Sequence, residues 1–112
     1  MLDTNKKPVI SFSDEQEQLL EVATNFCRDK FPLDRARARI AADTDFDKSV
    51  WDEIASLGWL GIAVPEEFGG SGLGLAEVVS VVEPSGYYLA GTPLVSTTLA
   101  AQALIAGGTK AQ

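Results

Sequence analysis

The sequence predicts an all-α fold, a small helical bundle that carries one long, ordered, glycine-rich loop. Three observations predict it. Apolar residues recur three and four positions apart in several segments, which is the period of an amphipathic helix. Capping and stop signals flank those segments where helices are expected to begin and end. Six of the 10 glycines fall between residues 58 and 74, which marks a single long loop.

The first helix is expected to follow an N-terminal arm over residues 1–12 and to open a domain over residues 13–112. Ser13 and Gln16 form an S-x-x-Q capping box, and Pro32 ends the helix because the residue before a proline avoids the α region. One apolar stripe runs along this helix: Leu19, Leu20, Ala23, Phe26 and Cys27.

Two shorter helices and the loop follow. Residues 33–42 alternate polar and apolar positions like a strand, but their Arg and Ala content favours a helix. The next helix runs from Asp47 to Leu57 and is stopped by Gly58. Loop 58–74 carries large apolar side chains, so we expect it to pack closely over the core.

The last two helices are predicted from apolar spacing. Residues 75–83 contain four valines, which favour a strand by propensity, yet their apolar positions recur as a helix face. We predict a helix that ends or kinks at Pro84. The final helix is expected to use Thr92 as N-cap and Pro93 as its first residue, and to stop at residues 107–108. Apolar or small residues occupy nearly all its faces, which is typical of a buried helix.

The overall charge excludes several classes of partner. The chain of 112 residues has nine Lys and Arg against 16 Asp and Glu, a net charge of −7. Binding to nucleic acid or to an anionic membrane surface needs many more cationic groups. The sequence has no run of apolar residues long enough to span a bilayer, and its one cysteine cannot form an internal disulfide. Because the N-terminus is polar and lacks an apolar stretch, we do not expect it to act as a signal peptide. We therefore expect a cytoplasmic location.

The charge is unevenly spread along the chain. Lys110 is the single charged residue among the 29 residues 84–112. Because a solvated segment is usually about a quarter charged, we expect this one to be buried against something. A domain of this size offers little surface for that, so we interpret the chain as incomplete or as associated with more protein.

The residue types present argue against chemistry performed by this chain itself. It contains no histidine, which removes Ser-His and Cys-His nucleophile pairs and the commonest transition-metal ligand. Cys27 lies in the apolar stripe and is interpreted as an inert core thiol. Glu66 and Glu67 are adjacent, so their side chains point apart on a solvated loop. We assign no catalytic, cofactor-binding or metal-binding residue.

Two further patterns are interpreted as structural. The segment GGSGLG matches neither a dinucleotide fingerprint after a strand nor a P-loop with its lysine, so it predicts a tight turn covering the bundle. Arg35, Arg37 and Arg39 could bind an anion or a neighbouring chain. The simpler interpretation is a solvated helix face paired with Asp34 and Asp43.

The segment 50–74, VWDEIASLGWLGIAVPEEFGGSGLG, resembles the N-terminal helical domain of acyl-CoA dehydrogenases. In that family a tryptophan-bearing helix leads into L-G-W/L-L-G-I, then V-P-E-E-F/Y-G-G-S-G, then a helix. Residues 12–32 resemble the family's opening helix, and residues 90–112 resemble its apolar helix followed by G-T-x-x-Q. The resemblance covers nearly the whole chain.

Three departures from the family pattern stand out. The family usually has E-E-L-G-R after the valine-rich helix, where this chain has EPSGY, and Pro84 puts the length of that helix in doubt. Thr92 and Pro93 shorten the connection to the last helix. The family also continues into a β-domain and a second helical domain, whereas this sequence stops at Gln112.

The resemblance implies an enzyme that desaturates an acyl-CoA thioester between its α and β carbons with FAD. In the family the base lies on the second helical domain and most FAD contacts come from the β-domain, so FAD is not expected to bind this chain alone. This chain would supply subunit contacts and part of the acyl-pocket wall, chiefly from the last helix. The expected wall residues are Val95, Thr98, Leu99 and Gln102.

The implied partners are an acyl-CoA substrate, an electron-transfer partner, and further subunits in a homo- or hetero-oligomer. Two alternatives stay open. The complete protein could be a related acyl-CoA oxidase or flavin monooxygenase that shares this domain. The chain could instead be a non-catalytic helical interaction module.

Overall fold

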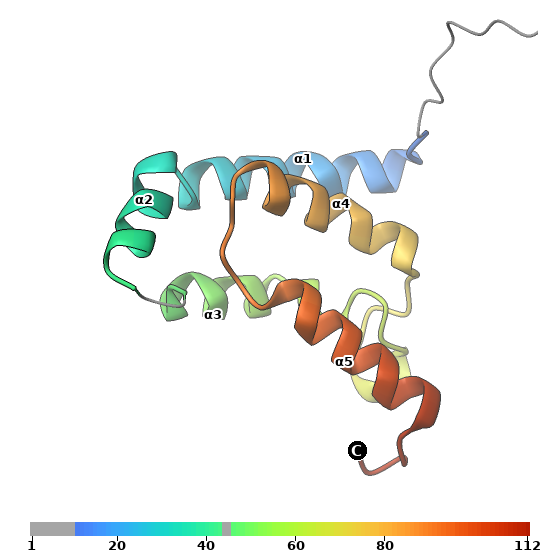
Figure 1. The fold of residues 1–112 in the computed structure, drawn as a ribbon. Helices are drawn as coiled ribbons and strands as arrows, with labels where there is room; N and C mark the ends of the chain where they lie inside the picture. The colour runs from blue at the N-terminus through green and yellow to red at the C-terminus, as the bar shows by residue number, and fades with distance from the viewer. Residues whose placement is uncertain (1–10, 44–45) are drawn as a thin grey trace, which may run out of the picture.

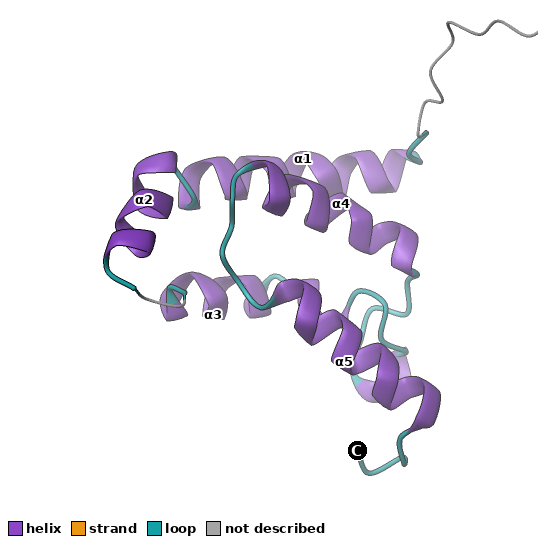
Figure 2. Ribbon diagram, in the orientation of Figure 1, coloured by secondary structure: helices purple, strands orange, loops and turns teal. Residues whose placement is uncertain are grey.

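The computed structural model describes residues 11–43 and 46–112. Within these ranges the chain is all α-helical, with two short 3₁₀ segments and no strand, which confirms the predicted fold class (Figure 2). The elements in chain order are α1 (Asp14–Lys30), α2 (Leu33–Ala41), α3 (Lys48–Ser56), η1 (Trp59–Gly61), η2 (Glu66–Phe68), α4 (Leu75–Tyr87) and α5 (Leu94–Gly107). Most of the expected N-terminal arm, residues 1–10, lies outside the described residues. No helix in the described part of the chain is long and apolar enough to cross a membrane.

The first helix begins as its sequence predicts. The Gln16 amide N–H donates to Ser13 Oγ at 3.2 Å, and the Ser13 amide N–H donates back to Gln16 Oε1 at 3.0 Å. These reciprocal bonds satisfy two amides that have no partner within the helix. The capping box is confirmed, and α1 ends before Pro32.

The third helix also begins and ends where its signals lie. The Asp47 carboxylate accepts hydrogen bonds from the amide of Ser49 at 2.9 Å and from that of Val50 at 3.5 Å. The Ser49 hydroxyl also donates to Asp47 Oδ1 at 2.6 Å, and this bond, followed by the amide bonds, holds the pKa of Asp47 below its ordinary value because each favours the ionised form. At the other end Gly58 adopts φ = 81°, the left-handed conformation that a helix stop requires and glycine adopts without strain.

The core lies where α1, α3 and α4 meet. α1 and α4 run side by side and make the most extensive contact between any two helices (Figure 1). Phe26 of α1 packs edge-on against Trp59, with ring centroids 5.2 Å apart. The buried core residues are Ala23, Cys27, Phe31, Val50, Ile54, Trp59, Ile62, Val78, Val81 and Leu94.

Helix α4 corrects one expectation and confirms another. Residues 75–83 are helical, as their apolar spacing predicts, but the helix does not end at Pro84; it continues to Tyr87. Pro84 cannot donate a hydrogen bond to the carbonyl four residues earlier, a loss that costs about 3 kcal/mol or more inside a helix. Pro84 is buried, so tertiary packing outweighs this local cost.

The end of α4 carries an unusual residue. Leu89 has φ = 54°, a left-handed conformation that costs a non-glycine residue about 1–2 kcal/mol. The Leu89 amide donates to the Gly86 carbonyl at 3.2 Å, and the Ala90 amide donates to the Ser85 carbonyl at 2.8 Å. This is the pair of bonds that defines a Schellman helix stop, here with leucine where glycine is usual.

Helix α5 differs from its prediction in two ways. It begins at Leu94, so Thr92 and Pro93 are not its N-cap and first residue; Pro93, with ψ = 34°, is itself the flanking residue. The helix is also not buried within this chain. Of its 14 residues, all of them described, only Leu94 is buried. The apolar residues of segment 84–112 were expected to be buried, but within this chain many of them stay exposed to solvent.

Candidate functional site

The four residues predicted as substrate wall lie along one side of α5. Val95, Thr98, Leu99 and Gln102 are spaced three and four apart, so they share a helix face, here called the wall face. Val95 is 52% exposed and Leu99 is 64% exposed, whereas Thr98 and Gln102 are partly buried. Large apolar side chains are thus presented to the surface on a helix without a charged residue.

The wall face is attached to loop 58–74 by one of its own members. Gln102 Nε2 donates to the Ala63 carbonyl at 3.1 Å, and this bond is partly buried. The hydroxyl of Thr98 donates to the Leu94 carbonyl at 2.8 Å, so its polar group is satisfied within the helix. Both polar residues of the wall face therefore have protein partners and leave the face apolar in character.

Loop 58–74 is an ordered reversal of the backbone. The amides of Ser71, Gly72 and Leu73 donate at 2.9–3.0 Å to the carbonyls of Gly61, Val64 and Ile62 respectively. Gly70 is required there, because a Cβ at that position would lie 2.1 Å from the Val64 carbonyl oxygen.

The amides of Gly69 and Gly70 also donate to loop carbonyls. Phosphate-binding loops instead leave several amides pointing at the ligand. This geometry supports the structural interpretation of GGSGLG.

The loop packs over the core in part. Trp59 and Ile62 are buried, as the prediction of close packing requires. Phe68 and Leu73 are each about half exposed, so the loop also presents apolar surface outward.

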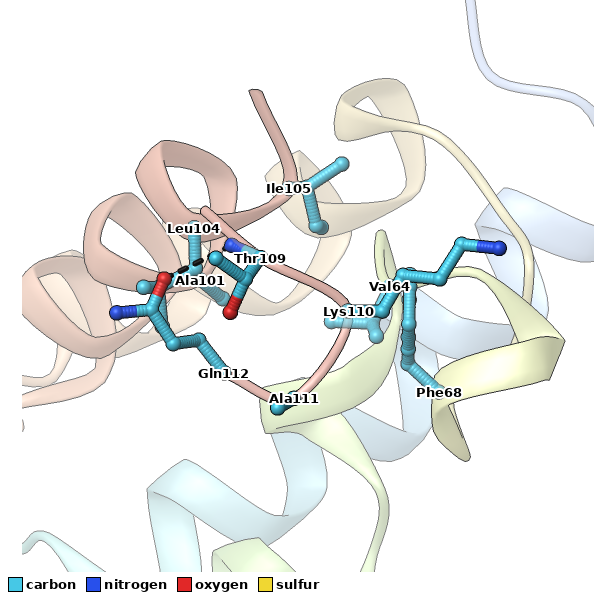
Figure 3. Close-up of a pocket in the computed structure, with 9 residues that line it drawn as sticks. All are labelled: Val64, Phe68, Ala101, Leu104, Ile105, Thr109, Lys110, Ala111 and Gln112. Carbon is cyan, nitrogen blue, oxygen red and sulfur yellow. Dashed lines mark hydrogen bonds between the residues drawn. The ribbon is translucent and has the colours of Figure 1, made fainter. Parts of the chain in front are cut away.

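A groove lies between this loop and the end of α5. Its volume is about 290 Å³, and the loop contributes Val64 and Phe68 to its lining (Figure 3). The remaining lining residues are Ala101, Leu104, Ile105, Thr109, Lys110, Ala111 and Gln112. The turn after α5 is held by the Thr109 amide, which donates to Gln112 Oε1 at 2.8 Å.

No wall-face residue lines this groove, which lies on a neighbouring side of α5. Sequence reasoning missed the groove. The signal was present in the apolar side chains of Val64 and Phe68 within a glycine-rich loop, but only the fold places them opposite Leu104 and Ile105.

The surroundings of Cys27, Glu66 and Glu67 favour structural roles for these residues. Cys27 is fully buried, and burial raises the pKa of its thiol above the ordinary value, opposed in part by contact with the Ser85 hydroxyl at 3.9 Å. A buried thiol of raised pKa is a poor nucleophile, as the inert-thiol interpretation expects. Glu66 and Glu67 are exposed on η2, and the Glu66 side chain lies against Gly72.

The arginines of α2 contact the backbone of other segments. Arg35 donates to the Lys30 carbonyl at 3.3 Å. Arg39 donates through Nη2 to the Leu89 carbonyl at 3.2 Å, across 50 residues of sequence. Arg35 and Arg37 are exposed, as the solvated-face interpretation expects, but no ion pair among the described residues joins either of them to Asp34 or Asp43. The interpretation also misses the long-range contact of Arg39.

Comparison with known proteins gives consistent matches. The family model for "Acyl-CoA dehydrogenase, N-terminal domain" matches residues 13–112. The chain is 34% identical over 97 residues to the acyl-CoA dehydrogenase IpdE2 of Mycolicibacterium smegmatis, and the aligned region covers 86% of this chain and 31% of that protein. It is 30% identical to the (2S)-methylsuccinyl-CoA dehydrogenase of Cereibacter sphaeroides, and here the aligned region covers 100% of this chain and 21% of that protein.

A solved structure gives the same result. A chain from a variant of the Tcur3481-Tcur3483 steroid ACAD superposes with a TM-score of 0.79 at 35% identity. The match covers 88% of this chain and 27% of that one. The chain thus spans less than a third of the length of each of these relatives.

Proposed function

We propose that this chain forms part of an enzyme that desaturates an acyl-CoA thioester between its α and β carbons. The chain belongs to the acyl-CoA dehydrogenase family, in which it is the N-terminal domain. The match over residues 13–112 carries this proposal. The dehydrogenase activities named above belong to the relatives, and they support the reaction class rather than a particular acyl group.

The wall face is the part of this domain that we assign to the substrate. An acyl chain needs an uncharged, closely packed channel, because burying a charge beside a hydrocarbon is costly. α5 has no charged residue, and Val95 and Leu99 lie open on it. The acyl chain would cover part of this apolar surface, and other parts of the complete enzyme would cover the rest.

The family depends on FAD, but the described residues do not fit FAD by themselves. A flavin dinucleotide carries a pyrophosphate, which proteins commonly hold with free backbone amides at a helix start or with cationic side chains. The loop amides from Gly69 to Leu73 are committed to loop carbonyls, and Lys110 is the single cation lining the groove. We therefore assign FAD binding to other parts of the complete enzyme and give this domain a substrate-shaping role.

The test is made on the complete gene product that carries this domain. Its visible spectrum is expected to show bound flavin, and anaerobic addition of acyl-CoA thioesters is expected to bleach that spectrum. Rapid reoxidation by oxygen with release of peroxide would indicate an oxidase or monooxygenase instead. A product without flavin, or a flavin that no acyl-CoA bleaches, would contradict the proposal and favour the interaction module.

The wall face is tested by filling it. Leu99→Trp is expected to lower kcat/KM for long acyl-CoAs about tenfold relative to short ones, because the larger ring occupies the channel. The matched control is Val22→Trp on α1, since Val22 is similarly exposed at 54%. An equal effect of both substitutions would remove Leu99 from the substrate wall.

A further inference from the structure

A residue of α2, Arg39, contacts the segment that connects α4 to α5. Arg39 donates to the carbonyl of Leu89, the left-handed residue at which the chain turns out of α4. A turn residue in a costly conformation persists when surrounding contacts determine it. The bond from Arg39 is one such contact, and it joins segments 50 residues apart.

The position of Arg39 also explains why residue 91 is a glycine. A Cβ built on Gly91 would lie 2.5 Å from Cζ and Nη2 of Arg39 and 2.8 Å from its Nε. The guanidinium group therefore lies directly against the Gly91 backbone. Arg39 and Gly91 are complementary: any other residue at position 91 displaces the arginine.

Besides the buried Leu94 at its start and its packing against η1, helix α5 is attached by two polar contacts. The connection over residues 88–93 holds its start through Arg39, and Gln102 holds it further along through the Ala63 carbonyl. Val95, Thr98 and Leu99 lie between these two attachments. Because most of α5 is not embedded in the core, we expect these contacts to contribute to its direction.

We propose that Arg39 is a positioning residue for the substrate wall: through Leu89 and Gly91 it sets the angle at which α5 leaves the bundle, and thereby which acyl chains the enzyme accepts. This inference rests on the proposed function. The rise of an α-helix is about 1.5 Å per residue, so Leu99 and Gln102 lie about 8 and 12 Å along α5 from its start, and a tilt of about 10° there moves them by about 1 and 2 Å. A displacement of about 1 Å is enough to disturb the positioning of a bound substrate.

The experiment uses the complete enzyme and five variants: Arg39→Gln, Arg39→Lys, Gly91→Ala, the double variant of Arg39→Gln with Gly91→Ala, and Arg37→Gln. Arg37 is the matched control, since it carries the same charge on the same helix and is exposed. Values of kcat and KM are measured across a series of acyl-CoA chain lengths, with flavin content recorded for each variant.

Arg39→Gln and Gly91→Ala are each expected to raise KM for the preferred acyl-CoA about fivefold and to flatten the chain-length preference, with kcat and flavin content little changed. Because both act through one contact, the double variant is expected to be no worse than the poorer single variant. Arg39→Lys is expected to restore part of the preference, since an ammonium can still donate to the Leu89 carbonyl. Arg37→Gln is expected to leave the profile unchanged.

Two results would overturn the inference. One is a chain-length profile that Arg39→Gln leaves unchanged even if it lowers the melting temperature, which would make the contact merely structural. The other is multiplication of the two single effects in the double variant. A wild-type enzyme that no acyl-CoA reduces would instead contradict the proposed function. Hydrogen exchange of α5 would then test the fastening itself: faster exchange in Arg39→Gln than in Arg37→Gln supports it, and equal exchange overturns it.

Discussion

Helices α4 and α5 are nearly equal in length and both strongly apolar, yet they are packed very differently. α4 has 13 residues and buries Val78, Ser80, Val81 and Pro84, whereas α5 has 14 residues and buries only Leu94. The difference lies in their neighbours, because α1 runs along α4 while α5 chiefly contacts η1 (Figure 1). Apolar composition shows that a helix needs cover, but it does not say which part of the protein provides that cover.

Charge distinguishes the two helices before packing does. α4 carries two charged residues, Glu77 at its start and the exposed Glu83 further along, whereas α5 carries no charged residue. A helix with a polar side fits at the edge of a bundle, while one without a polar side fits between protein layers. This contrast agrees with a domain that spans less than a third of its relatives' length.

The largest expected difference between the helices comes from placing a charge on each. Val81→Asp in α4 is expected to lower the unfolding free energy of the 112-residue chain by about 4 kcal/mol, because Val81 is fully buried and an aspartate there has no partner. Leu99→Asp in α5 is expected to change it by less than about 0.5 kcal/mol. Urea unfolding followed by circular dichroism measures both.

Val79→Asp is the control within α4, since Val79 is 44% exposed on the same helix. Its effect should be close to that of Leu99→Asp. At concentrations where the chain is monomeric, a loss of several kcal/mol for Leu99→Asp would show that α5 is covered within this chain and would remove the contrast.

The next effect concerns association. The 112-residue chain is expected to self-associate at micromolar concentration through α5, because contiguous apolar surface of several hundred Å² is rare on a stable monomer. Covering 400 Å² contributes about 10 kcal/mol before the entropy of association is subtracted. Leu99→Glu and Ile105→Glu are expected to weaken this association at least about tenfold.

Sedimentation velocity over a dilution series measures the association, with Val79→Glu in α4 as the control for an added charge. A strictly monomeric wild-type chain at high concentration would show that the apolar surface of α5 is too small or too dispersed to drive pairing.

A smaller effect is expected at the joint between the two helices. Leu89→Gly is expected to stabilise the chain by about 0.5–1 kcal/mol, because glycine adopts the positive φ without strain while its greater freedom in the unfolded chain offsets part of the gain. Thermal unfolding measures the change. Gly86→Ala, in a helical position with open space around a Cβ, is the comparison that tests glycine entropy alone. A destabilising Leu89→Gly would mean that the leucine side chain contributes more than its strain costs.

The smallest effect is a pH dependence at the start of α4. The pKa of Glu77 lies below its ordinary value of 4.5, because its carboxylate accepts hydrogen bonds from the Gly74 amide at 2.8 Å and from Gln16 Nε2 at 3.3 Å. A depressed pKa contributes stability above the unfolded-state pKa, and that contribution is lost as the pH falls through the folded-state value.

Glu77→Gln is therefore expected to be less stable than wild type at neutral pH and to approach it as the pH falls below about 4.5. Denaturant midpoints over the acid range measure this convergence, with Glu83→Gln as an exposed control on the same helix. A constant difference at all pH values would show that the carboxylate charge is not involved.

Local signals were sufficient for most of the fold. The capping box of Ser13 and Gln16, the carboxylate cap of Asp47 and the left-handed Gly58 each act within a few residues, so the sequence indicates where α1 and α3 begin or end. The motif over residues 50–74 was also sufficient to indicate the family. The residues of the wall face were chosen because the family resemblance implies a pocket wall on the last helix and an acyl chain needs uncharged surroundings, and their role is a proposal.

Sequence alone determined the all-α class, the helices, the ordered loop and the shortage of charge in residues 84–112, because each depends on side chains close together along the chain. Only the tertiary structure decided that α4 runs through Pro84, that Arg39 holds Leu89 and Gly91, and that α5 stays largely uncovered. These features depend on energies between distant segments: burial of Pro84 outweighs a missing helix bond, and a contact across 50 residues supports a strained turn. Such energies cannot be inferred from the neighbouring sequence, because they depend on which distant residues the tertiary structure brings into contact.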